Sequence, residues 1–175
     1  PNAARQHLDA LVSAGLLSRG VVERAGPGRR PQSFSLTPAG QRALSGPASH
    51  ELHEVVGAFA SYLVASGDGE QAHAIGEHWA ERHDPLPEVG PEGPVGALVE
   101  MLDILGFAPA RTTTDDGEAV VLRDCPLLDL AHEHPDVICE MHRGLVDGVM
   151  HRLGAAQGVR LLPFSEPDGC RVDLG

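Results

Sequence analysis

The sequence predicts an α+β protein in which helices alternate with pairs of antiparallel strands. Apolar residues recur at helical spacing in several segments, whereas three pairs of short segments alternate with period two around Gly-, Pro- or Asp-rich turns. Strands joined by such short turns form hairpins rather than parallel sheets. A Gly/Pro/Ser-rich break at 45–49 and a loop at 84–94 divide the chain into three predicted parts, 1–45, 46–94 and 95–175.

The first part, 1–45, is predicted to run helix, strand, basic turn, strand, helix. Ala4, Leu8, Leu11 and Val12 form one apolar helical face within 1–17, and Gly15 follows as a C-terminal stop. We expect strands at 21–25 and 33–37, separated by the turn Gly26-Pro27-Gly28-Arg29-Arg30-Pro31. Thr37 and Pro38 then begin a helix, as its cap and its first-turn proline.

The remaining elements are expected in two groups. The second part, 46–94, is predicted to be a helical linker or dimerisation region with helices at 50–65 and 70–83. The third part, 95–175, has the predicted order α-ββ-α-α-ββ, with its elements at 95–107, 108–114, 118–122, 126–133, 136–153, 158–164 and 169–174. This order is typical of an α+β domain.

Charge divides the chain in the same place. The chain carries a net charge of -12, yet 1–45 holds six arginines against two acidic residues, whereas the remainder holds seven arginines against 23. Such asymmetry favours nucleic acid as a partner for the basic segment alone. The chain has no apolar run long enough for a transmembrane helix, and the residues at its start do not resemble a signal peptide, so we expect a cytoplasmic protein.

A helix followed by a hairpin with a basic tip is the second half of a winged helix. The exposed N-terminal residues of such a helix read base edges in the major groove, which assigns this role to Asn2, Ala3, Arg5 and Gln6. The wing arginines would meet phosphate or a narrow minor groove; they are Arg24, Arg29 and Arg30.

These residues carry a family resemblance. The segments PNAARQHLDALVSAGLLSR and GRRPQSFSLTPAG resemble the bacterial ArsR-type and MarR-type winged-helix regulators. In that family two further helices precede the recognition helix, whereas this sequence starts at the recognition helix, so we expect a partial winged helix. The resemblance implies a homodimer that binds double-stranded operator DNA with two recognition helices in successive major grooves.

Three cysteines lie in the last 51 residues, and an odd number in a chain of this kind favours metal binding or redox chemistry over a disulfide framework. Cys139 and His142 share one face of a predicted helix, Cys125 lies between a predicted strand and a predicted helix, and Cys170 lies in the last predicted strand. Thiolates suit zinc or iron–sulfur centres, although the spacing is not that of a zinc finger. The alternative is that all three are small buried hydrophobic residues.

A second resemblance bears on this choice. The segments DCPLLDLAHEHPDVICEMHRGLVDGVMHRLG and GVRLLPFSEPDGCRVDL are similar to the C-terminal domain of SufR-like regulators, which hold an iron–sulfur cluster. The resemblance implies Cys125, Cys139 and Cys170 as cluster ligands, with zinc as the alternative metal. For the fourth ligand we favour His142, then His132 or His134, with a carboxylate, water or a partner also open.

The sequence therefore predicts a DNA-binding transcriptional regulator whose C-terminal sensor domain holds an iron–sulfur cluster or metal. One alternative is a winged-helix regulator that senses a small molecule in a C-terminal pocket, with structural cysteines; another is a stand-alone metal or cluster carrier. No phosphate loop, nucleophile elbow or HExxH motif points to an enzyme. His73, His78 and His83 spiral around a predicted helix and are expected at the solvated surface, whereas Trp79 is expected in the core or a dimer contact.

Overall fold

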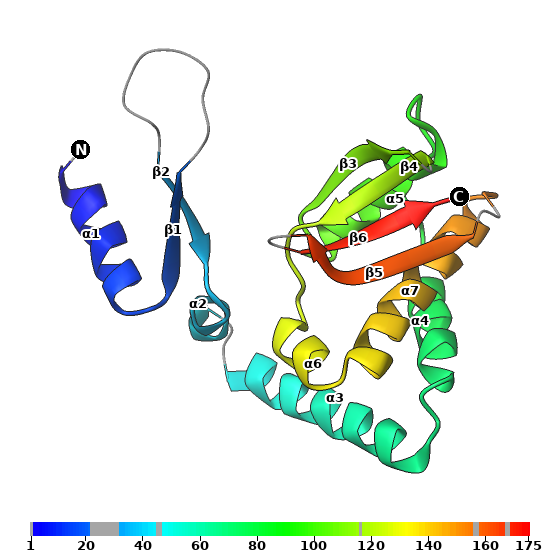
Figure 1. The fold of residues 1–175 in the computed structure, drawn as a ribbon, viewed down its shortest axis with the longest axis horizontal. Coiled ribbons are helices and arrows are strands. Elements are labelled where there is room, and N and C mark those ends of the chain that lie inside the picture. Colours follow the sequence, from blue (N-terminus) through cyan, green and yellow to red (C-terminus); the bar gives the residue numbers. More distant parts are fainter. Residues whose placement is uncertain (1, 22–31, 45–46, 116, 156–157, 167–168) are drawn as a thin grey trace. The chain divides into compact units, whose positions relative to one another are not determined.

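The computed structural model describes residues 2–21, 32–44, 47–115, 117–155, 158–166 and 169–175, and it has the predicted α+β composition (Figure 1). The chain divides into two compact units, 1–56 and 57–175. The long helix α3, Pro47–Ser66, begins in the first unit and ends in the second. Among the described residues, no helix is both long and apolar enough to cross a membrane.

The first unit begins with helix α1, Asn2–Ser13, and a two-stranded antiparallel sheet of β1, Leu17–Val21, and β2, Gln32–Leu36. The predicted stop at Gly15 is confirmed: Gly15 has φ 71°, and the Leu16 N–H donates to the Leu11 carbonyl at 2.9 Å. The prediction that the first strand begins at Val21 was wrong. The turn at Gly15 leads directly into the strand, and Leu17 already pairs with Leu36.

The predicted cap on the next helix is also confirmed. Helix α2 spans Pro38–Leu44, and the Thr37 Oγ1 accepts the Gly40 N–H at 3.0 Å while donating to the Gly15 carbonyl at 2.6 Å. One hydroxyl therefore ties the start of α2 to the end of α1. The predicted wing tip, with Arg24, Arg29 and Arg30, lies outside the described residues.

The second unit contains the predicted α-ββ-α-α-ββ order after α4. Its elements are α4, Gln71–Glu81; α5, Gly93–Ile104; β3, Pro109–Thr114; β4, Gly117–Leu122; α6, Leu128–Glu133; α7, Pro135–Arg152; β5, Val159–Glu166; and β6, Gly169–Leu174. The four strands form one antiparallel sheet in the order β3-β4-β6-β5. The C-terminal strand β6 therefore lies inside the sheet, and β5 lies at its edge.

The core of this unit lies between the sheet and its helices. Helix α7 packs against β5, α5 packs against α7 and β3, and α4 packs along α7 (Figure 1). The largest fully buried side chains are Leu98, Leu102, Phe107, Val120, Ile138, Leu145, Val146, Val149, Met150 and Val172. The prediction that the α5 helix continues to Phe107 was wrong, because Gly106 takes φ 86° and ends it, and Phe107 enters the core as a loop residue.

Small residues allow α4 and α7 to approach closely. A Cβ added at Gly76 would lie 2.0 Å from the Met141 carbonyl oxygen, and one added at Gly144 would lie 2.0 Å from the His73 carbonyl oxygen. Because only hydrogen fits at these two positions, the backbones of the two helices touch. This close packing fixes the position of α7, which supplies two of the site residues described next.

Candidate functional site

The structure brings the three cysteines into one pocket. Cys125 comes from the loop between β4 and α6, Cys139 from α7, and Cys170 from β6. His142, the favoured fourth ligand, lines the same pocket, and Phe107 and Phe164 complete much of its wall. Residues that are 45 positions apart in the sequence therefore share one small space in the fold.

Each thiol is positioned by its own element. Cys170 pairs with Leu122 of β4 and alternates with the buried Val172 and Leu174, which directs it to the core face of the sheet. Cys139 and His142 are three residues apart on the buried face of α7, as predicted. The Cys125 N–H donates to the Asp124 Oδ1 at 2.8 Å, a local bond that shapes the loop before α6.

Burial shifts the pKa values of three groups in the pocket, those of Cys125, Cys139 and His142. The pKa of the Cys125 thiol is raised to about 12, mainly by burial; a backbone hydrogen bond with Leu127 lowers it, and the nearby Cys170 and Asp124 add to the rise. Burial, followed by the neighbouring cysteines, likewise raises the pKa of Cys139 to about 12. Burial lowers the pKa of His142 to about 4, so its imidazole is neutral at pH 7.

His142 has a buried nitrogen without a partner. Only 5% of the residue is exposed, and its Nε2 is buried with no hydrogen bond in the structure. Its ring lies edge-on to Phe107, with centroids 5.0 Å apart, and 6.1 Å from the ring of Trp79. An orphaned buried nitrogen costs free energy unless something binds it. A neutral imidazole with a free nitrogen, beside three thiols, is a donor set suited to a soft or borderline metal.

The pocket is small. Its cavity volume is about 20 Å³, which is close to what one water molecule needs. Within the described part of the chain, no three His, Cys, Asp or Glu side chains converge closely enough to hold a single metal ion. The thiols therefore share a pocket without forming a closed mononuclear site.

The other predicted metal-site residues lie outside this pocket. His134 Nε2 lies 3.0 Å from the Ser61 Oγ, and His132 stacks on Phe164 with ring centroids 4.6 Å apart. Neither histidine lines the pocket. Of the three histidines considered as a fourth ligand, only His142 is positioned beside the thiols.

The predicted DNA-reading residues stand exposed where the structure describes them. Ala3, Arg5 and Gln6 lie exposed in the first turns of α1, while the side chain of Asn2 lies outside the described side chains. Arg19 of β1 is paired with Asp9 of α1 and lies over the ring of Phe34. That arginine therefore helps to hold α1 on the hairpin.

Two aromatic residues of the pocket wall, Phe107 and Phe164, were not predicted from the sequence. Phe107 was assigned to a helix, and Phe164 was treated only as the end of a strand. Pro163 could have indicated that the strand is irregular next to Phe164, because a proline within a strand indicates an edge position or a bulge. The bulge is present at that point of β5.

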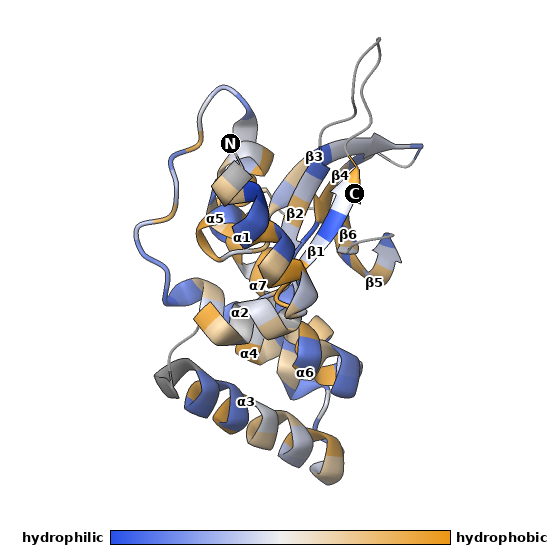
Figure 2. Ribbon diagram, turned by 90° about the vertical axis from the view of Figure 1, so that its left-hand side faces the viewer, coloured by the Kyte–Doolittle hydropathy of each residue, from blue (hydrophilic) through white to orange (hydrophobic). Residues whose placement is uncertain are grey.

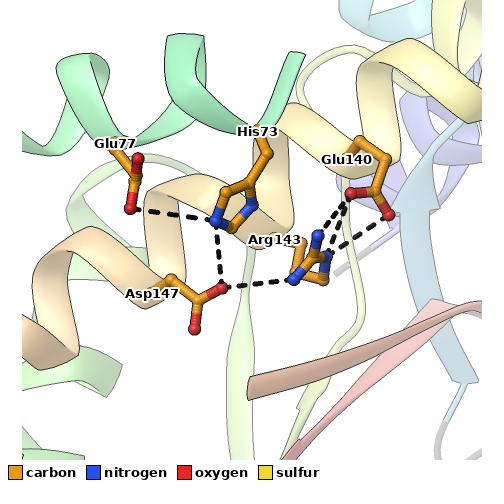
Figure 3. A network of polar contacts seen from close by, with 5 residues as sticks. All are labelled: His73, Glu77, Glu140, Arg143 and Asp147. Atoms are coloured by element: carbon orange, nitrogen blue, oxygen red, sulfur yellow. Dashed lines mark hydrogen bonds and ion pairs between the residues drawn. The ribbon is translucent and has the colours of Figure 1, made fainter. Parts of the chain in front are cut away.

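A second polar cluster joins α4 to α7 (Figure 3). His73 Nε2 lies 3.4 Å from Asp147 and 3.8 Å from Glu77, and Arg143 binds Glu140 and Asp147. The expectation that His73 is a solvated surface residue was wrong, because Gly144 draws its backbone against α7 and leaves its side chain one quarter exposed. These contacts join α4 to α7, so we assign this cluster a structural role.

Comparison with known proteins adds no family to this description: no protein-family model matches the chain, and no curated protein matches it.

Proposed function

We propose that this chain is part of a DNA-binding transcriptional regulator whose C-terminal unit senses through a cysteine-ligated iron–sulfur cluster or metal. The observation that carries the proposal is the shared pocket of Cys125, Cys139, Cys170 and His142. Three different elements supply these donors, and the orphaned Nε2 of His142 gives the pocket a fourth donor beside the three thiols.

The donor chemistry favours a cluster over zinc. Tetrahedral zinc with Zn–S bonds of about 2.3 Å draws its thiolates to within about 4 Å of one another, and the described donors do not converge in that way. In a polynuclear cluster the thiolates bind different iron atoms, so they can lie further apart. Cys125, Cys139 and Cys170 would hold the cluster, with His142 as the fourth ligand. The occupancy of the site would respond to the supply of iron, and the oxidation state of the bound group would respond to oxidants.

The small-molecule alternative receives less support from this pocket. Among its walls, the side chains that could orient a ligand are mostly thiols, which are weak hydrogen-bonding groups. We therefore place the sensing chemistry at the thiols themselves.

The DNA-binding half of the proposal depends on the basic first unit. Arg5 and Gln6 are exposed near the start of α1 and are free to meet base edges, for which arginine and glutamine are common partners. The six arginines of 1–45 would add phosphate contacts, including the predicted wing residues Arg29 and Arg30. The second unit is acidic and is not expected to contribute phosphate contacts.

The regulator is proposed to act as a homodimer through α3. Leu52, Val55, Phe59 and Tyr62 follow the 3-4-3 spacing of a coiled-coil seam, and each is at least half exposed. Figure 2 shows hydrophobic and hydrophilic bands alternating along this helix. A second copy of the chain offers the same stripe, so a symmetric pair would bury both stripes at once.

A change at the thiols can reach α4 through His142. Its ring contacts Trp79 of α4, and α4 packs tightly along α7. A shift of the imidazole toward a bound group would alter the packing of α4, the helix that follows α3 in the chain. We propose that this alters the spacing of the two reading helices in the dimer, and reciprocity requires that DNA binding alter affinity at the thiols by the same factor.

The first test is visible absorption with iron, sulfide and zinc analysis on protein purified without oxygen. Broad absorption near about 400 nm with matched iron and sulfide would support a cluster. About one zinc per colourless chain would instead support a mononuclear site. A metal-free protein that also fails reconstitution would overturn the sensing half of the proposal.

The second test separates the two halves of the proposal. Binding to operator DNA should weaken as salt rises, because phosphate contacts release counterions, and removal of one phosphate-binding arginine should reduce the log–log slope by about 0.9. Arg29→Ala and Arg30→Ala are the test variants, with Arg160→Ala in the second unit as the control. Salt-insensitive binding, or equal slopes for all three variants and the parent chain, would overturn the DNA-binding half.

A further inference from the structure

Strand β5 carries a bulge directly opposite one of the three thiols. Leu162 pairs with Arg171, and the next paired residues are Glu166 and Gly169, so 163–165 lie opposite the single residue Cys170. Pro163 has no N–H to donate to the ladder, which explains why the pairing breaks there. The Ser165 Oγ donates to the Leu162 carbonyl at 2.9 Å and so satisfies a group left near the break.

The bulge fixes Phe164 in an unusual conformation. Phe164 has φ 53°, in the left-handed region that residues other than glycine rarely adopt. In this conformation its N–H points to the Cys170 Sγ, at 3.4 Å. Bulges next to functional sites commonly redirect one side chain. Here the redirected side chain is the Phe164 ring, which lines the thiol pocket.

The ring sits at the boundary between pocket and solvent. Phe164 is 41% exposed although it lines the pocket, and its outer contact is the ring of His132, which is itself exposed. The two rings are nearly parallel, at 11°. Phe107 and Leu122 form other parts of the wall and are almost completely buried, and Leu128 and Leu161 are half-buried. Phe164 is the most exposed of the pocket-lining residues, so its ring can move without opening the core.

We propose that the Phe164 ring is a removable plug that closes the three-thiol pocket and must swing outward to admit a bound group. A cavity of about 20 Å³ holds one water-sized body, so anything larger needs a wall to move. The backbone of the bulge stays in place and keeps its hydrogen bond to Cys170, while the side chain turns toward solvent. The identity of the admitted group as a cluster or metal rests on the proposed function. The role of the Phe164 ring as a plug does not depend on it.

The test measures thiol access in the metal-free chain. Wild type, Phe164→Gly, Phe164→Leu and His132→Ala are treated with iodoacetamide, and the rate at each cysteine is followed by mass spectrometry. Phe164→Gly removes the ring, and glycine accepts φ 53° without strain, so this variant is expected to fold. Phe164→Leu retains an apolar side chain at the mouth of the pocket. Circular dichroism and melting temperature confirm that all four fold alike.

We expect Cys125 and Cys139 to be alkylated roughly tenfold faster or more in Phe164→Gly. Loss of about 1.4 kcal/mol of the free energy that keeps the pocket closed raises the fraction of molecules with an open pocket tenfold. His132→Ala should show a smaller increase, and Phe164→Leu should stay near wild type. Equal rates in wild type and Phe164→Gly would overturn the plug.

Metal uptake separates the plug from the proposed function. Cadmium alone is added to each metal-free variant, and ultraviolet thiolate-to-cadmium absorption is followed in time. Faster uptake by Phe164→Gly supports both the plug and a thiol site. Fast alkylation without cadmium uptake supports the plug and contradicts metal binding at the thiols, whereas cadmium uptake at equal rates in every variant contradicts the plug alone.

Discussion

His142 is the residue in which burial and chemistry conflict most directly. Its imidazole is surrounded by Phe107 and Trp79, and its Nε2 is buried without a partner. Burial holds its pKa at about 4, below the ordinary value of 6.5. The folded chain therefore favours the neutral ring, which is also the form that binds metals.

This depressed pKa predicts a loss of stability in acid. The His142 imidazole takes up a proton less readily in the folded chain than in the unfolded chain. Its contribution to the free energy of unfolding is therefore fully present above pH 6.5 and is lost as the pH falls through about 4. With about 1.4 kcal/mol for each unit of pKa difference, the loss is on the order of 3 kcal/mol. Denaturant unfolding of metal-free protein between pH 7 and 4 measures it.

The variant His142→Phe removes the titrating ring while keeping an aromatic side chain between Phe107 and Trp79. We expect it to unfold with a flatter pH dependence than wild type over this range. His151→Gln is the matched control, because His151 is exposed on the same helix. A wild-type slope in His142→Phe would contradict the burial argument.

The raised pKa values of Cys125 and Cys139 predict that metal binding is strongly pH-dependent. Both thiols are protonated at pH 7, and burial is the main cause. A thiophilic cation must displace the proton of each protonated thiol that binds it, so the affinity for cadmium should rise by up to about tenfold per pH unit for each displaced proton. Titrations followed by thiolate-to-cadmium absorption at pH 6.5 and 7.5 measure this.

The matched variant for this prediction is Cys125→Ser. It removes one displaced proton, so the increase per pH unit should be about tenfold smaller than in wild type. An affinity that does not change with pH in the wild-type chain would show that the thiols are not the ligands.

At the scale of elements, the crossing of α4 and α7 carries a further prediction. A methyl group at Gly144 would overlap the His73 carbonyl, which belongs to backbone and cannot rotate away. Gly144→Ala should therefore lower the free energy of unfolding by about 1–3 kcal/mol, the usual cost of overpacking. It should also disturb Trp79 fluorescence, because Trp79 lies on the helix that must move.

Gly90→Ala is the control, because a Cβ at Gly90 would meet no atom within 4 Å. Its stability should match wild type within the error of chemical denaturation. If Gly144→Ala were as stable as Gly90→Ala, the two helices would not be packed as closely as described here.

The order of elements could be predicted from the sequence because each depends on local patterns. The stop at Gly15, the cap at Thr37 and the hairpin before Gly117 are set by residues that act on their own backbone. The start of β1 was misplaced because the turn at Gly15 leads directly into the strand, and the end of α5 was misplaced because the turn at Gly106 ends the helix. Neither boundary follows from hydrophobic periodicity.

The sequence singled out the thiols and the histidine that share the pocket, but not the aromatic residues of its wall. Cys139 and His142 share a helical face by spacing alone, whereas the arrival of Cys170 beside them depends on β6 pairing between β4 and β5. The Phe164 ring reaches the pocket only because of the bulge in β5. The alternation of side chains along a regular strand does not predict where a bulge directs a side chain. His73 is less exposed than expected because Gly144 allows α4 and α7 to cross closely. All three outcomes depend on tertiary packing.

At the scale of the whole molecule, the apolar stripe on α3 predicts self-association. Phe59 and Tyr62 are two of its largest exposed residues, and burying each would contribute about 1.5–3 kcal/mol. The double variant Phe59→Ser, Tyr62→Ser should weaken dimerisation by at least about tenfold. Sedimentation over a range of concentrations measures the dissociation constant.

Val64→Ser is the control for this surface, because Val64 is also exposed and apolar on α3 but lies off the stripe. It should dimerise as wild type does. A monomeric wild-type chain, or equal effects of both variants, would show that α3 is not the dimer seam.

The bulge opposite Cys170 has one more consequence, which concerns aggregation. Strand β5 is an edge of its sheet, and a straight eight-residue edge offers a row of unpaired backbone groups to another chain. Pro163 and the bulge interrupt that row midway along the strand. A substitution that straightened β5 would therefore do more than withdraw an N–H from a thiol: it would supply a template for strand addition and make the protein prone to form fibres.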